Sequence, residues 1–559
     1  MTPMKYYLGL DLSTQQLKCT LIDQEHAIVF EHAVNFGRDL PHYNTENGAV
    51  SQGNDVVTSP PLMWVEAMDK LLSRLAETSY IPHIVAISGA GQQHGSVYWS
   101  HEGTQQLQHL DSTRDLKDQL ASAFSIDQSP IWQDSSTSKQ CRALEASVGG
   151  PEELARLTGS KAYERFTGNQ IAKIYQCRKQ QYDETEWITL VSSFMATLLL
   201  GRLAPMDAAE ASGTNMMDIR THRWIDSLVE KCGSPDLKNK LCLQPVEAIP
   251  LAPVNPYYVK RYGFSSECQI MPFTGDNSAT LVSMNLHLGD CVVSLGTSDT
   301  LLVALKQAEP TTESHLMAHP TDSSAYMGML CYKNGSLTRQ HFRDIYANGS
   351  WDTFNDLLNQ TPSTSHYMGF YYWMQEIIPF AKGIYRFDHG KLLTNGDDFT
   401  TNDDDNSSDS KSVAGVNIRC MIESQFLSMR TRLERLMNAS GNNNGDTAPS
   451  CGLQRILATG GAAANHTLLQ VLSNVFGVPV FKQQEGSNSA SLGGALLAKY
   501  GTVSDTMTFD AMVKEHQRQG DQLELICKPD RSITAYYTNL LAEYIRLENV
   551  VVDHYKHNQ

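Results

Sequence analysis

An aspartate and an asparagine stand at the start of an apolar run in the segment PFTGDNSATLV, residues 272–282. Gly275 precedes Asp276 and Asn277, and the residues that follow have the pattern of a helix. Asp and Asn are favoured helix caps, so one interpretation of this pair is purely structural. A carboxylate fixed at a helix start can also act as a general base for a reacting hydroxyl. Taken alone, the segment favours the cap.

Two turns rich in hydroxyl groups or glycine could hold phosphate oxygens. The first lies in LGLDLSTQQLK (residues 8–18) and the second in SLGTSDT (residues 294–300). Such turns present backbone N–H groups and hydroxyls, and a nearby carboxylate can hold hydrated magnesium. Each turn alone could be an ordinary hairpin turn, but two of them in one chain favour phosphate binding. The candidate contacts are Asp11 (for magnesium, through water), Thr14, Gly296, Thr297 and Ser298.

A third glycine-rich segment, ATGGAAAN (residues 458–465), leads from a predicted strand into a predicted helix. Gly460 and Gly461 would let a nucleotide approach the backbone closely, and a helix start favours negative charge. A tight strand-to-helix turn is the alternative. The chain has no G-x-x-x-x-G-K-[ST] motif and no G-x-G-x-x-G between a strand and a helix, so P-loop and Rossmann sites lack support.

Polar side chains also occur in GAGQQHGSVYW, IWQDSSTS and AYERFTGNQIAKIYQ. Gln93 and His94 directly follow an apolar strand, which is a usual place for ligand-binding loops in α/β folds. Asp134 and Arg165 come from the other two segments. Each has a structural alternative: a buried histidine, a turn aspartate or a surface ion pair. Together they offer hydrogen-bonding groups for a polyhydroxylated ligand without identifying a sugar.

The elements that must position these residues alternate between strands and helices, which predicts an α/β fold. An antiparallel meander opens the chain, and a second hairpin covers residues 291–305. Leu12 and Thr14 align with Leu295 and Thr297 at a constant offset, 295 − 12 = 297 − 14 = 283. This repeat predicts two related domains, 1–289 and 290–559, although two unrelated hairpins would give the same match. Polar inserts at 394–412 and 438–450 are predicted to be solvated loops.

Composition narrows the function. The chain has 559 residues and a net charge of −17, which argues against nucleic acid or an anionic membrane as the main partner and favours a small molecule. No apolar run approaches the roughly 20 residues that span a bilayer, and no secretory signal is visible. The 11 cysteines occur without any C-x-x-C spacing. They predict reduced thiols and a cytoplasmic location.

In their order along nearly the whole chain, these segments resemble the FGGY family of carbohydrate kinases, within the actin/hexokinase/Hsp70-like superfamily. The resemblance implies two ribonuclease-H-like domains that flank a deep active-site cleft, with sugar held mainly by the first and ATP mainly by the second. The segments are most similar to the eukaryotic-type members that phosphorylate xylulose. This similarity implies ATP- and Mg²⁺-dependent formation of D-xylulose 5-phosphate for the pentose phosphate pathway, by a monomer or homodimer.

The resemblance also assigns roles residue by residue. Asp276 matches the catalytic aspartate of the family's TGD motif, the base that takes the proton from the attacking sugar hydroxyl. The matched sugar contacts are His94, Arg165, Asp276 and Asn277, and the matched nucleotide contacts are Gly461, Ala462, Asn465 and, lining the adenine pocket, Trp351.

Three alternatives stay open at this point. The substrate could be another sugar or polyol of the family, such as ribulose, glycerol or gluconate. The chain could instead be a nucleotide-dependent binding or chaperone-like protein of the same superfamily, which would turn over ATP without sugar. It could also be a catalytically silent sugar sensor, which would bind sugar without releasing ADP.

Overall fold

The computed structural model describes residues 4–241, 243–363, 366–393, 398–399, 409–437, 452–483, 489–516 and 523–557. The chain divides into two compact units. Unit 1 comprises Met1–Leu286, Pro310–Met327 and Glu485–Asp521, and unit 2 comprises His287–Glu309, Gly328–Gln484 and Gln522–Gln559.

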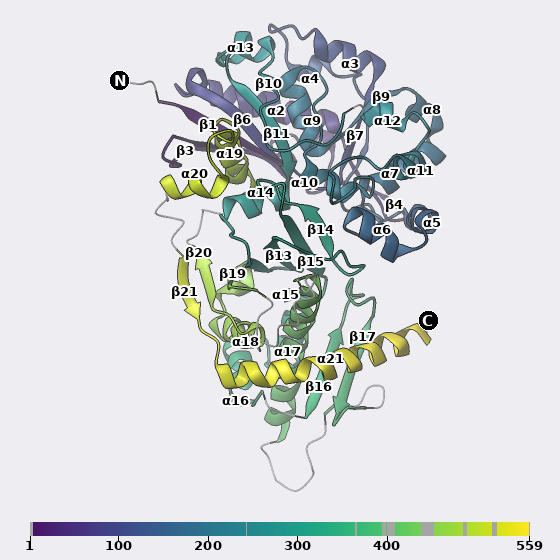
Figure 1. The fold of residues 1–559 in the computed structure, drawn as a ribbon, viewed down its shortest axis with the longest axis vertical. Helices are drawn as coiled ribbons and strands as arrows, with labels where there is room; N and C mark the ends of the chain where they lie inside the picture. Colours follow the sequence, from purple (N-terminus) through teal and green to yellow (C-terminus); the bar gives the residue numbers. More distant parts are fainter. Residues whose placement is uncertain are drawn as a thin grey trace. The chain divides into compact units, whose positions relative to one another are not determined.

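Unit 1 is built on a six-stranded mixed sheet (Figure 1). Its strands lie in the order β10 (Ala252–Pro253), β11 (Gln269–Gly275), β6 (Ile84–Gly91), β1 (Tyr6–Leu12), β2 (Gln16–Ile22) and β3 (Ile28–Asn35). The first three strands in the chain form the predicted antiparallel meander, and β6 and β11 run parallel to β1. Because parallel strands end at the same edge of a sheet, the residues after β1, β6 and β11 gather there.

Alternate residues of β1 face two different cores, as the two-residue period of a strand requires. Leu8 and Leu10 lie in a core with α2 (Pro61–Ala76) and α9 (Val191–Leu200), and α9 is buried along its whole length. Tyr7 lies in a second core with α19 (Ala490–Gly501). By this alternation, Asp11 at the end of β1 belongs to the α19 face.

Small residues let α19 approach the sheet closely. A Cβ added to Gly9 would lie 1.8 Å from the carbonyl oxygen of Ser491, and one added to Gly494 would lie 2.6 Å from the Cα of Gly89. The hydroxyl groups of Thr20 and Ser491 are 2.8 Å apart. α19 also packs against α14 (Asp276–Ser283). α19, with its small residues, therefore supports the helix that begins with Asp276.

The rest of unit 1 carries the loops around the sheet edge. A ribbon of β7 (Ser96–Ser100) and β9 (Thr185–Leu190) and a sheet of β4 (Val50–Gly53), β5 (Val56–Ser59) and β8 (Ser129–Pro130) lie among its helices. β14 (His315–Ala318) also belongs to this unit. The other helices are α1 (Phe36–Asp39), α3 (His101–Gln108), α4 (Leu116–Gln119), α5 (Ser138–Val148), α6 (Pro151–Thr158), α7 (Thr167–Cys177), α8 (Lys179–Asp183), α10 (Ala208–Ala211), α11 (Asp226–Cys232), α12 (Leu237–Leu241), α13 (Pro256–Tyr262) and α20 (Phe509–Glu515).

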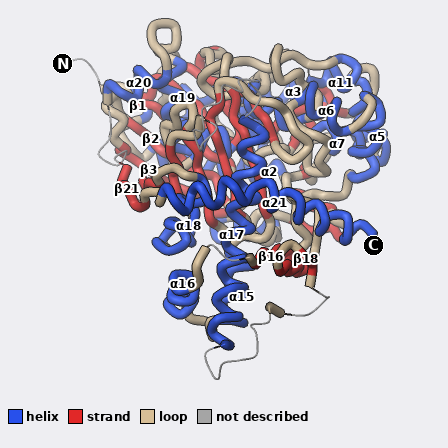
Figure 2. The backbone as a smooth tube through the Cα atoms, turned by 60° about the horizontal axis from the view of Figure 1, so that its bottom comes forward, coloured by secondary structure: helices blue, strands red, loops and turns tan. Residues whose placement is uncertain are grey.

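Unit 2 contains a second mixed sheet in which β15 (Tyr326–Tyr332), β13 (Asp299–Leu305), β12 (Asp290–Leu295), β19 (Arg455–Thr459), β20 (Val480–Gln483) and β21 (Leu523–Cys527) are neighbours in that order. A smaller sheet is formed by β16 (Tyr367–Tyr372), β17 (Gly383–Asp388) and β18 (Lys391–Leu392). The helices are α15 (Ser336–Tyr346), α16 (Trp351–Gln360), α17 (Asp409–Met437), α18 (His466–Phe476) and α21 (Arg531–His557). Figure 2 shows α21 crossing α17, with β16 beside both.

The compact units differ from the two continuous domains, 1–289 and 290–559, that the sequence predicted. The main break falls close to the predicted one, but residues 310–327 and 485–521 pack with unit 1. Residues 485–521 belong to unit 1 because α19, which lies in this segment, packs closely against β1. Most of the two predicted loops lies outside the described residues, and α17 begins inside the first of them, so residues 409–412 are helical.

No helix in the described part of the chain is long and apolar enough to cross a membrane.

Candidate active site

Asp276 is the first residue of α14 and directly follows β11. Gly275 occupies the N-cap position, so the interpretation of Asp276 as the cap is wrong. The carboxylate oxygen Oδ1 accepts hydrogen bonds from the backbone N–H and the side-chain amide of Asn277, at 2.8 and 3.2 Å. Burial raises the pKa of Asp276 to about 6, against the lowering effect of backbone hydrogen bonds. The group is therefore mostly ionised at pH 7 and can accept a proton.

The loop after β6 reaches the start of α14. The side-chain amide of Asn277 donates to Oε1 of Gln93 at 3.0 Å, so two predicted sugar contacts hold each other. The neighbouring Gln92 is buried, and neither polar atom of its side chain has a hydrogen-bond partner within the described residues. Because buried polar groups are normally paired, Gln92 is a further candidate for binding a ligand.

His94 lies in the same loop, in a left-handed backbone conformation with φ of 70°. Its Nδ1 is 3.0 Å from the carbonyl oxygen of Gly213, and its ring stacks on Phe166 with centroids 4.5 Å apart. Burial, assisted by the charge of Arg165, lowers the pKa of His94 to about 3. The imidazole is therefore neutral. Since Nδ1 must donate to the carbonyl, Nε2 can accept a hydrogen bond from a hydroxyl group.

Arg165 is oriented by a residue that the sequence did not single out. A guanidinium nitrogen of Arg165 lies 2.8 Å from Nε2 of His315, in β14. The guanidinium group also lies over the ring of Tyr163, 5.1 Å from its centroid. His315 is buried, and desolvation together with the charge of Arg165 holds its pKa well below the ordinary value. A neutral His315 accepts the hydrogen bond and fixes the direction of the guanidinium group.

Asp134 has internal partners for both carboxylate oxygens. Oδ1 accepts from the side-chain amide of Gln170 at 2.9 Å and from the backbone N–H of Ser136 at 3.0 Å. Oδ2 accepts from the backbone N–H of Val57 at 3.2 Å. These bonds fix the loop that follows β8. They give Asp134 a positioning role, and its predicted contact with sugar stays a prediction.

Asp11, at the end of β1, is the second carboxylate at this sheet edge. Its Oδ1 is buried without a hydrogen-bond partner within the described residues. Burial and the charge of Asp276 raise the pKa of Asp11 to about 7. A carboxylate whose ionised form is disfavoured by Asp276, and whose Oδ1 is unpaired, fits a hydrated magnesium ion, which would neutralise that charge. In the turn beyond, the indole N–H of Trp132 donates to the hydroxyl of Thr14 at 2.9 Å.

Two further carboxylates lie behind Asp276, and the sequence did not assign them. Asp207 caps α10 and accepts a hydrogen bond from the hydroxyl of Thr274 at 2.6 Å, which anchors the end of β11. Glu210 hydrogen-bonds with the hydroxyl of Ser192. Desolvation raises the pKa of Asp207 to about 7 and that of Glu210 well above its ordinary value, with Asp276 contributing to the shift of Glu210. The only sequence signal was two acidic residues three positions apart in DAAEAS.

In unit 2, Gly296, Thr297 and Ser298 form the turn between β12 and β13, and Ser336 N–H donates to the carbonyl oxygen of Gly296 at 2.9 Å. Asp299, the first residue of β13, accepts two hydrogen bonds from the buried guanidinium group of Arg339, at 2.7 and 2.8 Å. This ion pair holds the turn against α15.

Gly460 and Gly461 follow β19, as predicted. Gly460 has φ of 82°, and an added Cβ would lie 2.7 Å from the carbonyl oxygen of Leu295, whereas a Cβ on Gly461 would meet nothing within 4 Å. Gly460 therefore shapes the turn, and Gly461 leaves its backbone open. Ala462 continues the short 3₁₀ helix Gly461–Ala464.

Asn465 and Trp351 are connected through α16. Asn465 caps α18, and its side-chain amide donates to Oδ1 of Asn355 at 2.8 Å. Trp351 lies one helical turn before Asn355 and is 37% exposed. The guanidinium group of Arg343 lies over its ring, 4.8 Å from the centroid. The structure thus brings the predicted adenine-pocket residue and the predicted nucleotide residue into one group.

The chain has a two-domain α/β fold of the kind found in sugar kinases. It matches a crystal structure described as xylulose kinase from Rhodospirillum rubrum with a TM-score of 0.77 and 15% identity, covering 99% of this chain and 100% of that chain. It also matches Plasmodium falciparum glycerol kinase with ADP, with a TM-score of 0.71 and 16% identity, covering 98% of each chain.

Sequence comparison identifies the family. Residues 125–283 match the N-terminal domain, and residues 291–502 the C-terminal domain, of the FGGY family of carbohydrate kinases. Xylulose kinase of Rattus norvegicus is 40% identical over 98% of this chain and 97% of its own length, and xylulose kinase 2 of Arabidopsis thaliana is 40% identical over 99% of both. The chain belongs to the FGGY family of carbohydrate kinases.

Proposed function

We propose that the protein transfers the γ-phosphoryl group of ATP to the 5-hydroxyl group of D-xylulose, giving D-xylulose 5-phosphate and ADP, which would supply the pentose phosphate pathway. Support for the substrate comes from xylulose kinases of a mammal and a plant that are 40% identical over nearly the whole chain. The observation that carries the reaction is Asp276, a carboxylate with raised pKa at the start of a supported helix, beside two carboxamides and a neutral histidine.

In this proposal, unit 1 binds and activates the sugar. His94 accepts a hydrogen bond from one hydroxyl group, Arg165 donates to another oxygen, and Asn277 and Gln93 bind further hydroxyls. Asp276 takes the proton from the attacking hydroxyl group, a contribution of about 10²–10⁴ in rate for a well-placed base. The orientation of Arg165 by His315 would favour one arrangement of hydroxyl groups over others.

Unit 2 would bind the nucleotide. The turn at residues 296–298 and the open backbone at Gly461 would donate to phosphate oxygens, with the adenine near Trp351 and Asn465. Magnesium, held through water by Asp11, would neutralise charge on the transferred phosphoryl group. Phosphoryl transfer depends mainly on positioning and charge stabilisation, so no P-loop lysine is required. A cytoplasmic location and a monomeric or dimeric state stay predictions.

A coupled assay of ADP release tests this function directly. The purified full chain is given ATP and D-xylulose, D-ribulose, glycerol or gluconate, with Mg²⁺ or with EDTA. We expect ADP release that requires both D-xylulose and Mg²⁺. Greater kcat/KM with another substrate would reassign the specificity. ADP release without any sugar would favour a nucleotide-dependent binding protein, and xylulose binding without ADP release would favour a sugar sensor.

A further inference from the structure

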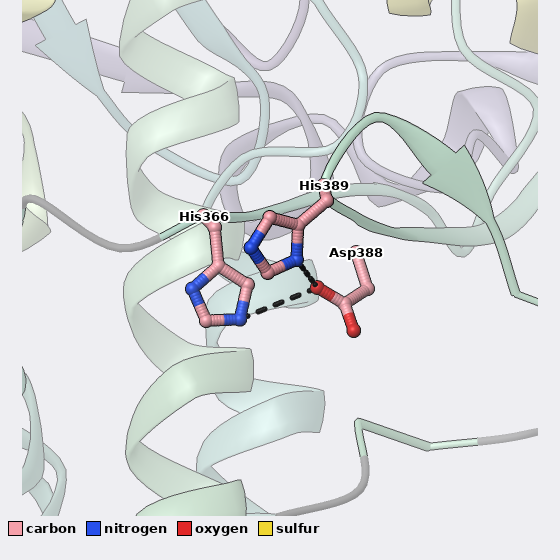
Figure 3. A group of neighbouring side chains, drawn as sticks. All are labelled: His366, Asp388 and His389. Carbon is pink, nitrogen blue, oxygen red and sulfur yellow. Dashed lines mark hydrogen bonds and ion pairs between the residues drawn. The ribbon is translucent and has the colours of Figure 1, made fainter.

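Three potential metal ligands meet at one end of the small sheet of unit 2. They are His366, just before β16, Asp388, the last residue of β17, and His389, in the following turn (Figure 3). Their ligand atoms lie within 4.8 Å of one another, and no other group of three such residues occurs in the described part of the chain. We propose that these three residues bind a divalent transition-metal ion of the zinc type.

The backbone of the hairpin fixes this arrangement. β16 and β17 are antiparallel, with Tyr367 opposite Asp388, and the N–H of His389 donates to the carbonyl oxygen of His366 at 3.2 Å. The two histidines are therefore neighbours across the strand pair, where side chains stand close enough to bind one ligand. His389 and Gly390 form a two-residue turn into β18 with φ of 46° and 72°. Histidine is among the few non-glycine residues enriched in this left-handed conformation, which here carries the imidazole over His366.

The side chains converge on one oxygen. Figure 3 shows both imidazole rings directed at Oδ1 of Asp388, which lies 3.3 Å from Nε2 of His366 and 2.6 Å from Nδ1 of His389. The rings themselves are stacked, with centroids 4.0 Å apart and an angle of 25° between their planes. Convergence of two nitrogens and a carboxylate is the feature that distinguishes this group from a simple pair of His and Asp on a surface.

The ligand types select the class of ion. Imidazole nitrogen and carboxylate oxygen bind zinc at about 2.0–2.2 Å, so that two ligands in a tetrahedral site stand roughly 3.3 Å apart. The two His–Asp distances, 3.3 and 2.6 Å, lie near that separation, and all three ligand atoms lie within 4.8 Å of one another. Magnesium and calcium prefer oxygen ligands alone, whereas imidazole suits zinc, copper and nickel. The side chains of His366, Asp388 and His389 are 44%, 39% and 71% exposed, respectively. An ion and its remaining water ligands therefore have free access to the group.

The location of the group indicates what the ion would do. β16 and β17 are joined through residues 373–382, at the other end of the hairpin. The three ligands lie at the end where no covalent connection joins the two strands. An ion bound there would tie the start of β16 to the turn after β17. Since it would bind only the folded sheet, it would stabilise the fold in proportion to its occupancy.

Titration of the metal-stripped full chain with ZnCl₂, followed by calorimetry, tests this inference. We expect one zinc site whose affinity falls at least about tenfold in His366→Ala and in His389→Ala. Changes to residues that only support metal ligands already lower metal affinity by about 10–100-fold, so loss of a ligand should cost at least the lower of these values. His101→Ala is the matched control, because His101 is an exposed histidine that pairs with a single carboxylate, Glu186, and should leave binding unchanged. Circular dichroism without metal checks that the variants are folded.

Titration with CoCl₂ separates this site from binding to thiols such as the exposed Cys177. The inference predicts that bound cobalt gives a visible spectrum without a thiolate charge-transfer band. This spectrum should be lost in His366→Ala and in His389→Ala. Equal zinc affinity in the wild type and in the two variants, or a cobalt spectrum of thiolate type, would overturn it. Neither result bears on sugar phosphorylation, which the assay of ADP release tests separately.

Discussion

The main sheets of units 1 and 2 share one topology. In their order across the sheet, β3, β2, β1, β6, β11 and β10 of unit 1 correspond to β15, β13, β12, β19, β20 and β21 of unit 2. In both, an antiparallel hairpin leads to two strands parallel to its first strand and then to an antiparallel edge strand. The sequence offset of 283 between the two hairpin turns therefore coincides with a repeated strand order, which favours two related domains over two unrelated hairpins.

The corresponding strand ends carry different chemistry. β1 ends beside Asp11, whereas the residue 283 positions later in β12 is Ser294. β6 leads into Gln93 and His94, whereas β19 leads into two glycines. One sheet edge thus offers side chains that accept protons and bind hydroxyl groups, and the other offers open backbone. This difference supports the proposal that one copy of the fold, in unit 1, binds the sugar and the other copy, in unit 2, binds the nucleotide.

Removal of the base from unit 1 should have the largest effect. Asp276→Asn keeps the size of the side chain but cannot accept the proton, so we expect kcat with D-xylulose to fall by about 10²–10⁴. Sugar affinity, measured by calorimetry, should change little because Asn277 and Gln93 remain. Near-normal turnover in this variant would remove Asp276 from the role of base.

An ion pair specific to unit 2 should dominate the stability of its turn. Arg339→Met leaves Asp299 buried and unpaired, which we expect to lower the free energy of unfolding by about 3–5 kcal/mol. Gln16 stands at the position equivalent to Asp299 in the repeat, so unit 1 has no such pair there. Arg546→Met removes the exposed pair with Glu543 and should cost less than about 1 kcal/mol. Equal losses in denaturant unfolding would contradict the assigned importance of the buried pair.

The two glycines after β19 should respond differently. Gly460→Ala forces a Cβ into a left-handed turn and against Leu295, and should destabilise the protein by about 1–3 kcal/mol. Gly461→Ala has open space around it and should leave thermal unfolding unchanged. If nucleotide lies on this backbone, Gly461→Ala should still raise KM for ATP. An unchanged KM for ATP in Gly461→Ala would argue against nucleotide contact there.

The activity should depend on pH through Asp276. Its pKa is raised to about 6, so the carboxyl group is protonated, and inactive as a base, at lower pH. With saturating Mg²⁺, which would hold Asp11 in its ionised form, we expect kcat/KM for D-xylulose to fall about tenfold per pH unit below about pH 6 and to be level above it. A profile that stays level down to pH 4.5, measured where the protein remains folded, would contradict a base with a raised pKa.

The smallest effect should come from the residue that orients Arg165. His315→Gln should raise KM for D-xylulose about fivefold, the equivalent of about 1 kcal/mol for one hydrogen bond, with little change in kcat. His319→Gln is the matched control, since His319 is buried in the same part of the chain and bonds with Thr321 instead of Arg165. The same change in KM for both variants would indicate a general disturbance of this segment.

Local patterns in the sequence predicted local structure well. The meander, the second hairpin and the turn after β19 all form as the sequence indicated, because strand alternation and glycine pairs act within a few residues. The resemblance to the FGGY family is confirmed by sequence comparison over nearly the whole chain.

Contacts between distant segments could not be predicted in this way. His315 reaches Arg165 across 150 positions of sequence, and α19 returns to β1 from nearly the other end of the chain. Asp207 and Glu210 gain their raised pKa values from burial beside β11, which no local pattern reports. The proposed metal ligands are the residue before β16, the last residue of β17 and a turn residue, and only the pairing of the two strands brings the histidines together.

Hydrogen exchange of the full chain with each ligand alone tests the proposed division most directly. D-xylulose should slow amide exchange in unit 1, around residues 92–95, 165–170 and 275–280, and ADP should slow it in unit 2, around residues 296–299 and 459–466. Protection of the unit 2 turns by D-xylulose alone, or of only unit 1 by ADP, would contradict the assignment of sugar to the first sheet and nucleotide to the second.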